Sequence, residues 1–296
     1  VEALLNADLV VASGCGLITD AFKINAGRWL DMLGVAIRCG IPTAMLGQGL
    51  GPIQDQELLE RFVRTVPCVD AILIRENGAG LDLLKQARVP ETKIFVTGDD
   101  AVELAYGEKR AVGGNQIGIN LRIARYAELD EKIPEHFRNL LVEKARQYQC
   151  VLTGIPILRD GGASDLQTLQ LLLDAKNTGE ELDTPLKVIR RVSDCRVVVT
   201  GSYHAGVFAL AQGIPVVAII QSAYYRDKFQ GLAEQFGCGC IVLQADDAEF
   251  LKKLGTAIDE LWAQAGELKP KLLAAAERQI QSAQSAYAKL PALLRS

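Results

Sequence analysis

Short runs of apolar, largely β-branched residues alternate with amphipathic helical stretches along most of the 296-residue chain. This alternation constrains the fold most strongly, because it is typical of βαβ units that form parallel sheets with right-handed crossovers. The sequence therefore predicts an α/β protein. The expected strands are residues 8–13, 42–47, 71–74, 93–96, 116–122, 150–153, 196–200, 215–220 and 240–243.

A polar, glycine-rich segment around residues 105–116 interrupts the alternation with turn chemistry. We interpret it as the linker between two doubly wound, Rossmann-like domains with parallel sheets. The expected organisation is an N-terminal domain over residues 1–110, a C-terminal domain over 111–245 and long C-terminal helices over 246–296. Lys269-Pro270 is expected to divide the last segment into two helices, because proline disfavours helical geometry in the residue before it.

The composition argues against several classes of function. A net charge of −4 without Lys/Arg runs provides no field that attracts nucleic acid. No apolar stretch reaches the roughly 20 residues of a transmembrane helix. The seven cysteines are scattered, and Cys238-Gly-Cys240 lacks the second pair or nearby histidine of a zinc site. We therefore expect no metal, and reduced cysteines typical of the cytosol.

Polar and glycine-rich segments follow several of the predicted strands, where ligands of open parallel sheets bind. Gly14 and Gly16 allow close approach of the backbone to a ligand, or simply form a tight turn. Three glycines bracket Gln48 ahead of Pro52, which is suited to the first turn of a helix whose N–H groups favour an anion. A turn that needs only flexibility is the alternative.

Two arginines directly follow predicted strands, one in each expected domain. Arg75 follows Ala-Ile-Leu-Ile, and Arg122 follows Ile-Asn-Leu, which includes Asn120. Because a guanidinium pairs with carboxylate or phosphate at two points, this placement predicts an anionic ligand. A structural tether to a neighbouring aspartate is the alternative for either arginine. Asp20 and the pair Asp99-Asp100 are candidates for orienting the arginines or activating a hydroxyl.

One of the two histidines in the chain, His204, lies between a buried strand and a helix of small residues. Ser202 or the glycine before it is positioned to cap that helix. A core histidine is the alternative, but imidazole at a strand end and helix start favours proton transfer or hydrogen bonding in a site. His136, on an ordinary amphipathic helix, is interpreted as structural. Lys228 either reaches the site or lies on a solvated helix face.

An ordered set of blocks up to about residue 237 resembles the polysaccharide pyruvyl transferase family. The blocks are DLVVASGCGLITD, IPTAMLGQGLGPI, ILIRENGAGLDLL, IGINLR and SDCRVVVTGSYHAGVFALAQGIPVVAI, followed by YYRDKF. The resemblance implies a GT-B-like fold whose C-terminal helices pack back on the N-terminal domain. It also implies transfer of a pyruvyl group from phosphoenolpyruvate to two hydroxyls of a sugar as a cyclic ketal.

The resemblance implies roles for individual residues. His204 would be catalytic by contacting the donor or moving a proton, and no cofactor or metal would be needed. Phosphoenolpyruvate would be the donor substrate, and the acceptor would be a sugar or lipid-linked saccharide. The substrate-binding residues would be Arg122, Arg75, Asn120, Gln48, Gly14, Gly16, Asp20, Ser202, Tyr203 and Lys228.

The chain departs from the family pattern in three places. The family often has Arg-Leu-His where this chain has Ser202-Tyr203-His204, which removes a cation expected beside the donor phosphate. The turn Ser-Gly-Cys-Gly stands where the family tends to have three glycines. We also expect the first strand of the N-terminal domain to be missing ahead of Val1.

The sequence is compatible with two other functions. A nucleotide-sugar glycosyltransferase would share the fold, although no acidic residue suited to a ribose follows His204 in QSAYYRDKF. A non-catalytic sugar- or anion-binding protein would agree with the missing arginine. As a pyruvyl transferase of cell-surface polysaccharide synthesis, the protein is expected in the cytoplasm, with loose association at the inner face of the plasma membrane if the acceptor is lipid-linked. The sequence predicts neither the acceptor sugar nor the oligomeric state.

Overall fold

A computed structural model describes residues 2–14, 16–121, 135–159, 164–220 and 222–295 and divides the chain into two compact units. Unit 1 comprises Val1–Asp100 and Arg278–Ser296, and unit 2 comprises Ala101–Glu277. Each unit contains one all-parallel sheet, which confirms the predicted α/β class. Helix α5 (Ala101–Gly107) opens unit 2 and packs against helix α9 (Tyr203–Ala211).

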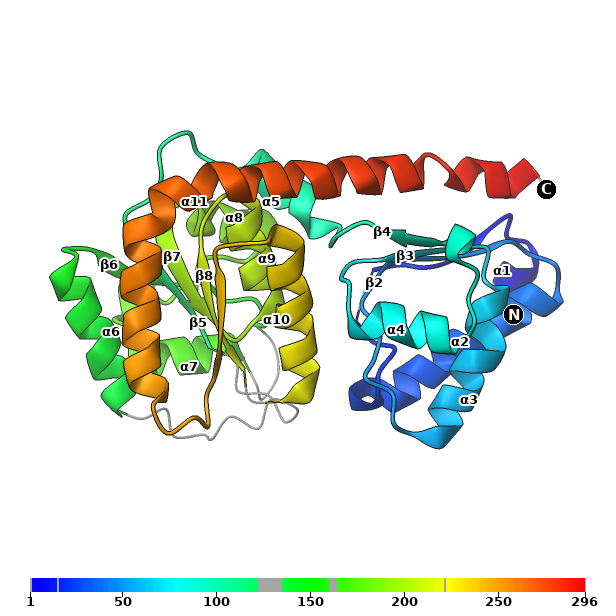
Figure 1. Ribbon diagram of the computed structural model, residues 1–296, viewed down its shortest axis with the longest axis horizontal. Helices are drawn as coiled ribbons and strands as arrows, with labels where there is room; N and C mark the ends of the chain where they lie inside the picture. Colours follow the sequence, from blue (N-terminus) through cyan, green and yellow to red (C-terminus); the bar gives the residue numbers. More distant parts are fainter. Residues whose placement is uncertain (1, 15, 122–134, 160–163, 221, 296) are drawn as a thin grey trace. The chain divides into compact units, whose positions relative to one another are not determined.

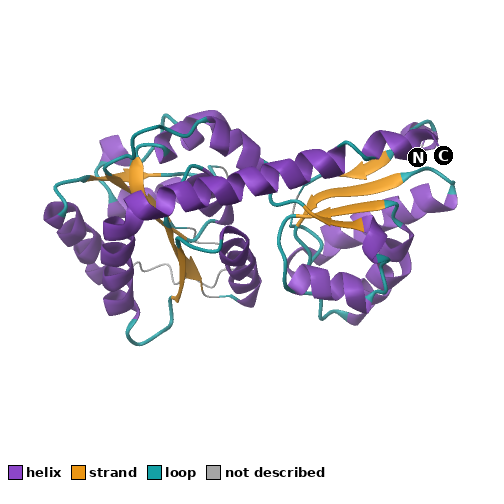
Figure 2. Cartoon of the chain, turned by 45° about the horizontal axis from the view of Figure 1, so that its top comes forward, coloured by secondary structure: helices purple, strands orange, loops and turns teal. Residues whose placement is uncertain are grey.

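The sheet of unit 1 has four parallel strands in the order β1-β2-β3-β4. A short helix α1 (Glu2–Leu5) precedes them, and α2, α3 and α4 cover one face of the sheet (Figure 1). The end of the C-terminal helix covers the other face, where Ala286 packs with Leu46 and Leu73, so strands lie between helical layers (Figure 2). The bounds are β1 (Val10–Ala12), α2 (Lys23–Arg38), β2 (Thr43–Gln48), α3 (Gln56–Thr65), β3 (Ala71–Ile74), α4 (Ala79–Gln86) and β4 (Ile94–Val96).

The sheet of unit 2 has five parallel strands in the order β6-β5-β7-β8-β9. Val197, Val198 and Val199 are fully buried, because a parallel strand covered on both faces favours a continuous apolar run. The bounds are β5 (Gln116–Asn120), α6 (Glu135–Gln147), β6 (Val151–Gly154), α7 (Asp165–Leu172), α8 (Pro185–Val192), β7 (Cys195–Thr200), β8 (Val216–Ile220), α10 (Ala223–Phe236) and β9 (Cys240–Gln244).

The C-terminal segment forms one helix, α11 (Phe250–Tyr287), followed by a 3₁₀ turn over Leu290–Arg295. The expectation that Lys269-Pro270 separates two helices is therefore wrong. Proline removes one helical N–H donor, and such a site commonly bends a helix. The ribbon of α11 changes direction along its course but does not end (Figure 1). Contacts on both sides of the proline hold the helix: Lys144 Nζ pairs with Asp259 at 2.7 Å, and the Tyr106 hydroxyl donates to Glu277.

None of the helices in the described residues has the length and apolar character needed to span a bilayer. The cysteines of the described residues are all free thiols.

Candidate functional site

The carboxyl end of the unit 2 sheet is tied together by a buried amide. Asn120, at the end of β5, is 0% exposed and donates through Nδ2 to Ile155 O and Asp165 Oδ2, both at 2.8 Å. Its Oδ1 accepts from Thr200 Oγ1 at 3.2 Å. These bonds join the ends of β5 and β7 to the loop after β6. The predicted ligand contact of Asn120 stays a prediction, and its observed partners are protein groups.

A carboxylate that the sequence reasoning missed completes this network. Asp165 opens α7, is 0% exposed and also accepts from the backbone N–H groups of Ile157 and Leu158, both at 2.8 Å. It therefore fixes the loop that follows β6. The available signal was an acidic residue directly after Ser164, which caps α7 by accepting from Leu166 N.

The turn between β7 and α9 presents the predicted catalytic histidine. Ser202 occupies the N-cap position of α9, but its side chain makes no capping hydrogen bond, in contrast to the expected cap. Its N–H donates to Thr200 Oγ1 at 2.8 Å. The Ser202 hydroxyl is buried and has no hydrogen-bond partner among the described residues. Tyr203 follows it and is only 3% exposed.

His204 is the one exposed residue of α9 and is surrounded along the helix by buried residues. Its ring meets the ring of Tyr203 edge-on with centroids 5.8 Å apart, and lies 6.3 Å from Phe208. A helix that is buried almost all round has no solvated face of its own, so one exposed position on it is unusual. The alternative of a buried core histidine is therefore excluded.

His204 opens onto a pocket of about 190 Å³ at the carboxyl ends of β6 and β7. Arg159, half-buried in the loop after β6, lines the same pocket. Its guanidinium donates to the backbone carbonyls of Leu182 and Glu180. The remaining lining residues are Pro156, Ile157, Leu182, Asp183, Thr184, Pro185, Val188 and Phe208.

Lys228 reaches the neighbourhood of Tyr203 rather than this pocket. Its Nζ donates to the Tyr224 hydroxyl and lies 3.9 Å from the centre of the Tyr224 ring. It is 5.8 Å from the centre of the Tyr203 ring. The aromatic faces stabilise the ammonium group by cation–π attraction.

In unit 1, two predicted ligand residues are buried at the ends of β2 and β3. Gln48 is 0% exposed and donates through Nε2 to Ala12 O at 2.8 Å and Leu46 O at 2.9 Å. Arg75 is 2% exposed and forms ion pairs with Glu76 at 2.8 Å and Asp99 at 3.3 Å. The tether to a neighbouring aspartate is therefore present, and a direct role of Arg75 in anion binding stays a prediction.

Asp20 holds the loop that follows Pro52. Its carboxylate accepts from Gln54 N at 2.6 Å and from Asp55 N at 3.2 Å. Asp55 in turn caps α3 by accepting from Leu58 N. Asp20 thus orders the entry to a helix, and its predicted roles in orienting an arginine or contacting a substrate stay predictions.

Gly14, after β1, and Gly47, near the end of β2, lie close to the carboxylate of Asp100. A Cβ at Gly14 would lie 3.3 Å from Asp100 Oδ2, and one at Gly47 would lie only 2.4 Å from it. Asp100 Oδ1 accepts from the Tyr287 hydroxyl at 2.9 Å. Burial raises the pKa of Asp100, and burial together with Asp100 raises the pKa of Tyr287. Gly16 also follows β1, and the predicted contacts of Gly14 and Gly16 with a ligand stay predictions.

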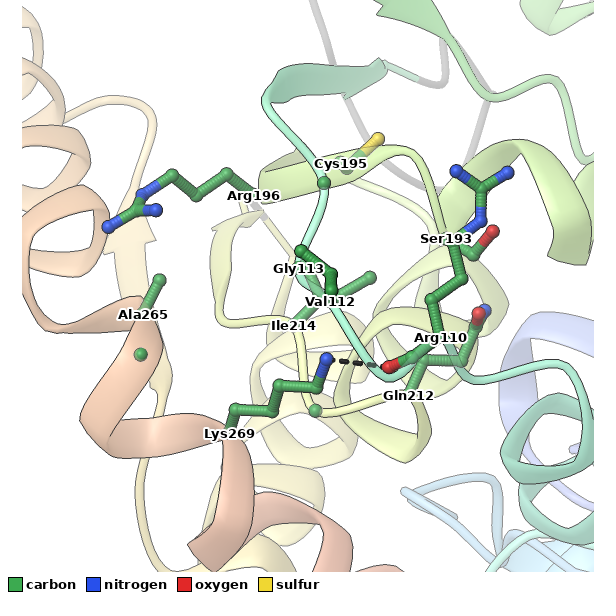
Figure 3. A pocket seen from close by; sticks show the side chains of 13 residues that line it. Arg110, Val112, Gly113, Ser193, Cys195, Arg196, Gln212, Ile214, Ala265 and Lys269 are labelled. Atoms are coloured by element: carbon green, nitrogen blue, oxygen red, sulfur yellow. Dashed lines mark hydrogen bonds between the residues drawn. The ribbon is translucent and has the colours of Figure 1, made fainter.

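Three further observations show what the candidate site does not include among the described residues. Arg122 lies outside the described residues. Within the part of the chain that the structure describes, no three His, Cys, Asp or Glu side chains are grouped to hold a metal ion. Another pocket of unit 2, of about 200 Å³, lies at the amino ends of the strands, where Lys269 Nζ donates to Arg110 O at 2.6 Å (Figure 3). It contains none of the predicted site residues.

The fold and the position of the site define a GT-B-like protein with two Rossmann-like units. The family model of polysaccharide pyruvyl transferases matches residues 3–222, and the chain belongs to this family. The match includes His204 and the carboxyl ends of β1 to β8.

Solved structures support the fold class. HepE (Alr3699) of Anabaena in complex with UDP is 13% identical with a TM-score of 0.57, covering 98% of this chain and 80% of that chain. UDP-GlcNAc 2-epimerase from Methanocaldococcus jannaschii is 16% identical with a TM-score of 0.54, covering 87% of this chain and 71% of that one. The epimerase from Neisseria meningitidis bound to UDP-GlcNAc is 14% identical with a TM-score of 0.53, covering 100% and 80%. No curated protein matches the sequence.

Proposed function

We propose that the protein transfers the pyruvyl group of phosphoenolpyruvate to two hydroxyls of a sugar, as a step in the synthesis of a cell-surface polysaccharide. Family membership over residues 3–222 supports transferase chemistry of this kind. The observation that carries the proposal is the exposed imidazole of His204 at a pocket lined by Arg159, at the carboxyl ends of parallel strands. This is the edge where ligands of such sheets bind.

The reaction needs proton transfers and stabilisation of an anion. The methylene carbon of phosphoenolpyruvate takes a proton, and the carbon bearing the phosphate bonds to the first sugar hydroxyl, which loses its proton. The bond between this carbon and the phosphate oxygen then breaks, and the phosphate leaves with the electron pair. The second hydroxyl adds to the same carbon and loses its proton. The products are the ketal and inorganic phosphate. In this proposal His204, which lines the pocket, moves one of these protons, and a fixed cation stabilises the departing phosphate.

The size of the pocket favours a small donor. At about 190 Å³ it lies below the range of about 300–1,000 Å³ that is usual for drug-sized ligands. A nucleotide sugar is the second candidate donor, since HepE and the Neisseria epimerase were solved with UDP and UDP-GlcNAc. Non-catalytic binding of a sugar or anion is the third candidate.

Ligand-dependent unfolding separates the three candidates. Phosphoenolpyruvate, UDP, UDP-GlcNAc and a panel of monosaccharides are added separately, and the unfolding temperature is measured. A ligand at about 100 times its dissociation constant adds about 2.7 kcal/mol to the free energy of unfolding. Stabilisation by phosphoenolpyruvate and not by UDP supports the proposal, and the reverse result contradicts it. Phosphate release from phosphoenolpyruvate that depends on a sugar acceptor then distinguishes an enzyme from a binding protein.

The two histidines of the chain provide a matched pair of variants. His204→Ala should lower acceptor-dependent phosphate release by about 10²–10⁴-fold, the usual contribution of a general acid–base group. Because the side chain is exposed, the unfolding temperature should change little. His136→Ala, on the exposed face of α6, should leave the rate unchanged. Full activity in His204→Ala would show that the histidine has no catalytic role.

A further inference from the structure

Two polar side chains from separate elements line the pocket of about 190 Å³ at the carboxyl ends of β6 and β7. Arg159 comes from the loop after β6, and His204 comes from the first turn of α9. The walls between them are largely apolar, since Leu182, Val188 and Phe208 are each less than 8% exposed. A charge near such walls is poorly screened, so an ion bound there interacts strongly with it.

The guanidinium of Arg159 is oriented by neutral groups. Nη1 donates to Leu182 O, and Nη2 donates to Glu180 O at 2.6 Å. No carboxylate of the described residues forms an ion pair with Arg159, so its positive charge is held in place without a direct counter-ion. Asp183 also lines the pocket, but its carboxylate pairs with Lys187 at 2.7 Å. The hydrogen bond to Lys187 is the largest cause that lowers the pKa of Asp183, and the charge of Arg159 is the smallest.

The loop that carries Arg159 is held in place by the buried hydrogen bonds of Asp165 and Asn120. Asp165 holds the backbone N–H groups of Ile157 and Leu158, the two residues immediately before Arg159. Asn120 binds the same carboxylate. A charged group whose supporting loop is held in this way needs little rearrangement to bind a ligand.

Two other cations of the described residues near this edge, Lys228 and Arg191, are engaged elsewhere. Lys228 lies over the rings of Tyr224 and Tyr203. Arg191 donates to Thr153 Oγ1 and pairs with Glu181. The turn from β7 to α9 contains no cation, because its residues 201–203 are glycine, serine and tyrosine. Arg159 is the cation of the described residues that lines the pocket together with His204.

We propose that Arg159 binds the phosphate group of the donor beside His204 and thereby determines donor specificity. This inference rests on the proposed function and names the cation of that site. The two side chains would have separate roles in the reaction. Arg159 stabilises the phosphate as the bond between phosphate oxygen and carbon breaks, and His204 moves a proton.

Inorganic phosphate and phosphoenolpyruvate serve as separate probes in calorimetric titrations. Arg159→Gln should weaken binding of inorganic phosphate by about 10- to 100-fold, as expected for the loss of a charged hydrogen bond. Arg159→Lys, which keeps the charge but not the two-point geometry, should fall between this variant and the original protein. Arg190→Gln is the control for net charge: Arg190 is exposed on α8, pairs with Glu108 and does not line the pocket. It should change the affinity less than twofold.

Labelling of the unaltered protein by phenylglyoxal, read by mass spectrometry, does not depend on the folding of any variant. Phosphate should slow the modification of Arg159 and leave that of Arg190 unchanged.

If Arg159 only clamps the turn over residues 180–182, Arg159→Gln would lower the unfolding temperature, the affinity for phosphate would stay the same, and phosphate would not slow the labelling of Arg159 in the unaltered protein. That result overturns the inference. The inference is also overturned if the original protein and Arg159→Gln bind phosphoenolpyruvate with equal affinity. In that case the proposal that phosphoenolpyruvate is the donor still stands. Protection of Arg159 by phosphate and UDP but not by phosphoenolpyruvate supports the phosphate site and refutes the donor.

Discussion

Substitution of Gly47 tests whether the carboxylate of Asp100 lies directly against the backbone of β2 at this glycine. Gly47 has a φ of +57°, at an irregularity in the register between β2 and β3. Gly40, after α2, has a φ of +69°, and a Cβ added there would meet no atom within 4 Å, so it provides a matched control. Both glycines belong to unit 1.

The magnitude follows from two separate costs. A side chain with a left-handed backbone costs about 1–2 kcal/mol, which applies to Gly40→Ala and Gly47→Ala alike. At Gly47 the added Cβ would also lie 2.4 Å from Asp100 Oδ2, so that side chain must rotate away and lose its bond to the Tyr287 hydroxyl. The loss of one hydrogen bond adds about 1 kcal/mol. Gly47→Ala should therefore cost about 2–3 kcal/mol, and Gly40→Ala about 1–2 kcal/mol.

Urea unfolding followed by tryptophan fluorescence measures these free energies. The chain has two tryptophans, Trp29 in unit 1 and Trp262 in unit 2. In a Trp262→Phe background, Trp29 reports on unit 1, where it packs against the core. Repeating both substitutions with Asp100→Ala should remove the difference between them. Equal costs of Gly40→Ala and Gly47→Ala with Asp100 present, or a difference that persists without Asp100, would refute the reasoning.

Two further predictions concern buried or partly buried carboxylates. Asp165→Ala should lower the free energy of unfolding of unit 2 by about 3–5 kcal/mol, because it leaves several donors without their acceptor. Asp165→Asn should lower it less. Trp262 fluorescence measures both free energies, and equal losses in the two variants would contradict the network. Burial raises the pKa of Asp100 in the folded protein above the ordinary aspartate value of 3.8, so its contribution to stability falls as pH rises from that value through the folded pKa. Asp100→Asn should remove this fall, and the variant should gain in stability relative to the original protein between acid and neutral pH; a difference independent of pH would contradict the shift.

The strands could be predicted because their signal is local. All nine expected runs correspond to strands, and β3 (Ala71–Ile74) is typical: each of its four residues is buried. Burial on both faces of a parallel sheet requires a continuous apolar run, which a single sequence displays. Turn chemistry then places the polar segments at the strand ends.

The partners of the polar residues could not be predicted, because they come from distant parts of the chain. The hydroxyl that binds Asp100 belongs to Tyr287, 187 residues away. Asp165 reaches Asn120 across 45 residues. The single course of α11 through Pro270 is likewise a tertiary effect, since contacts of the flanking turns with unit 2 oppose the local preference of proline.

Exposure divides the polar residues at the strand ends into two groups with different consequences. Asn120 and Gln48 are fully buried and donate to the backbone of neighbouring strands or loops, so their hydrogen bonds stabilise the edge itself. His204 is exposed, and Arg159 is half-buried with no ion pair among the described residues. A fully buried amide cannot reach a ligand outside the protein, whereas the exposed imidazole of His204 and the guanidinium of Arg159, which has no ion pair among the described residues, line a pocket that a ligand can enter. Variants of the first group should therefore alter stability first, and variants of the second should alter ligand binding while the fold persists.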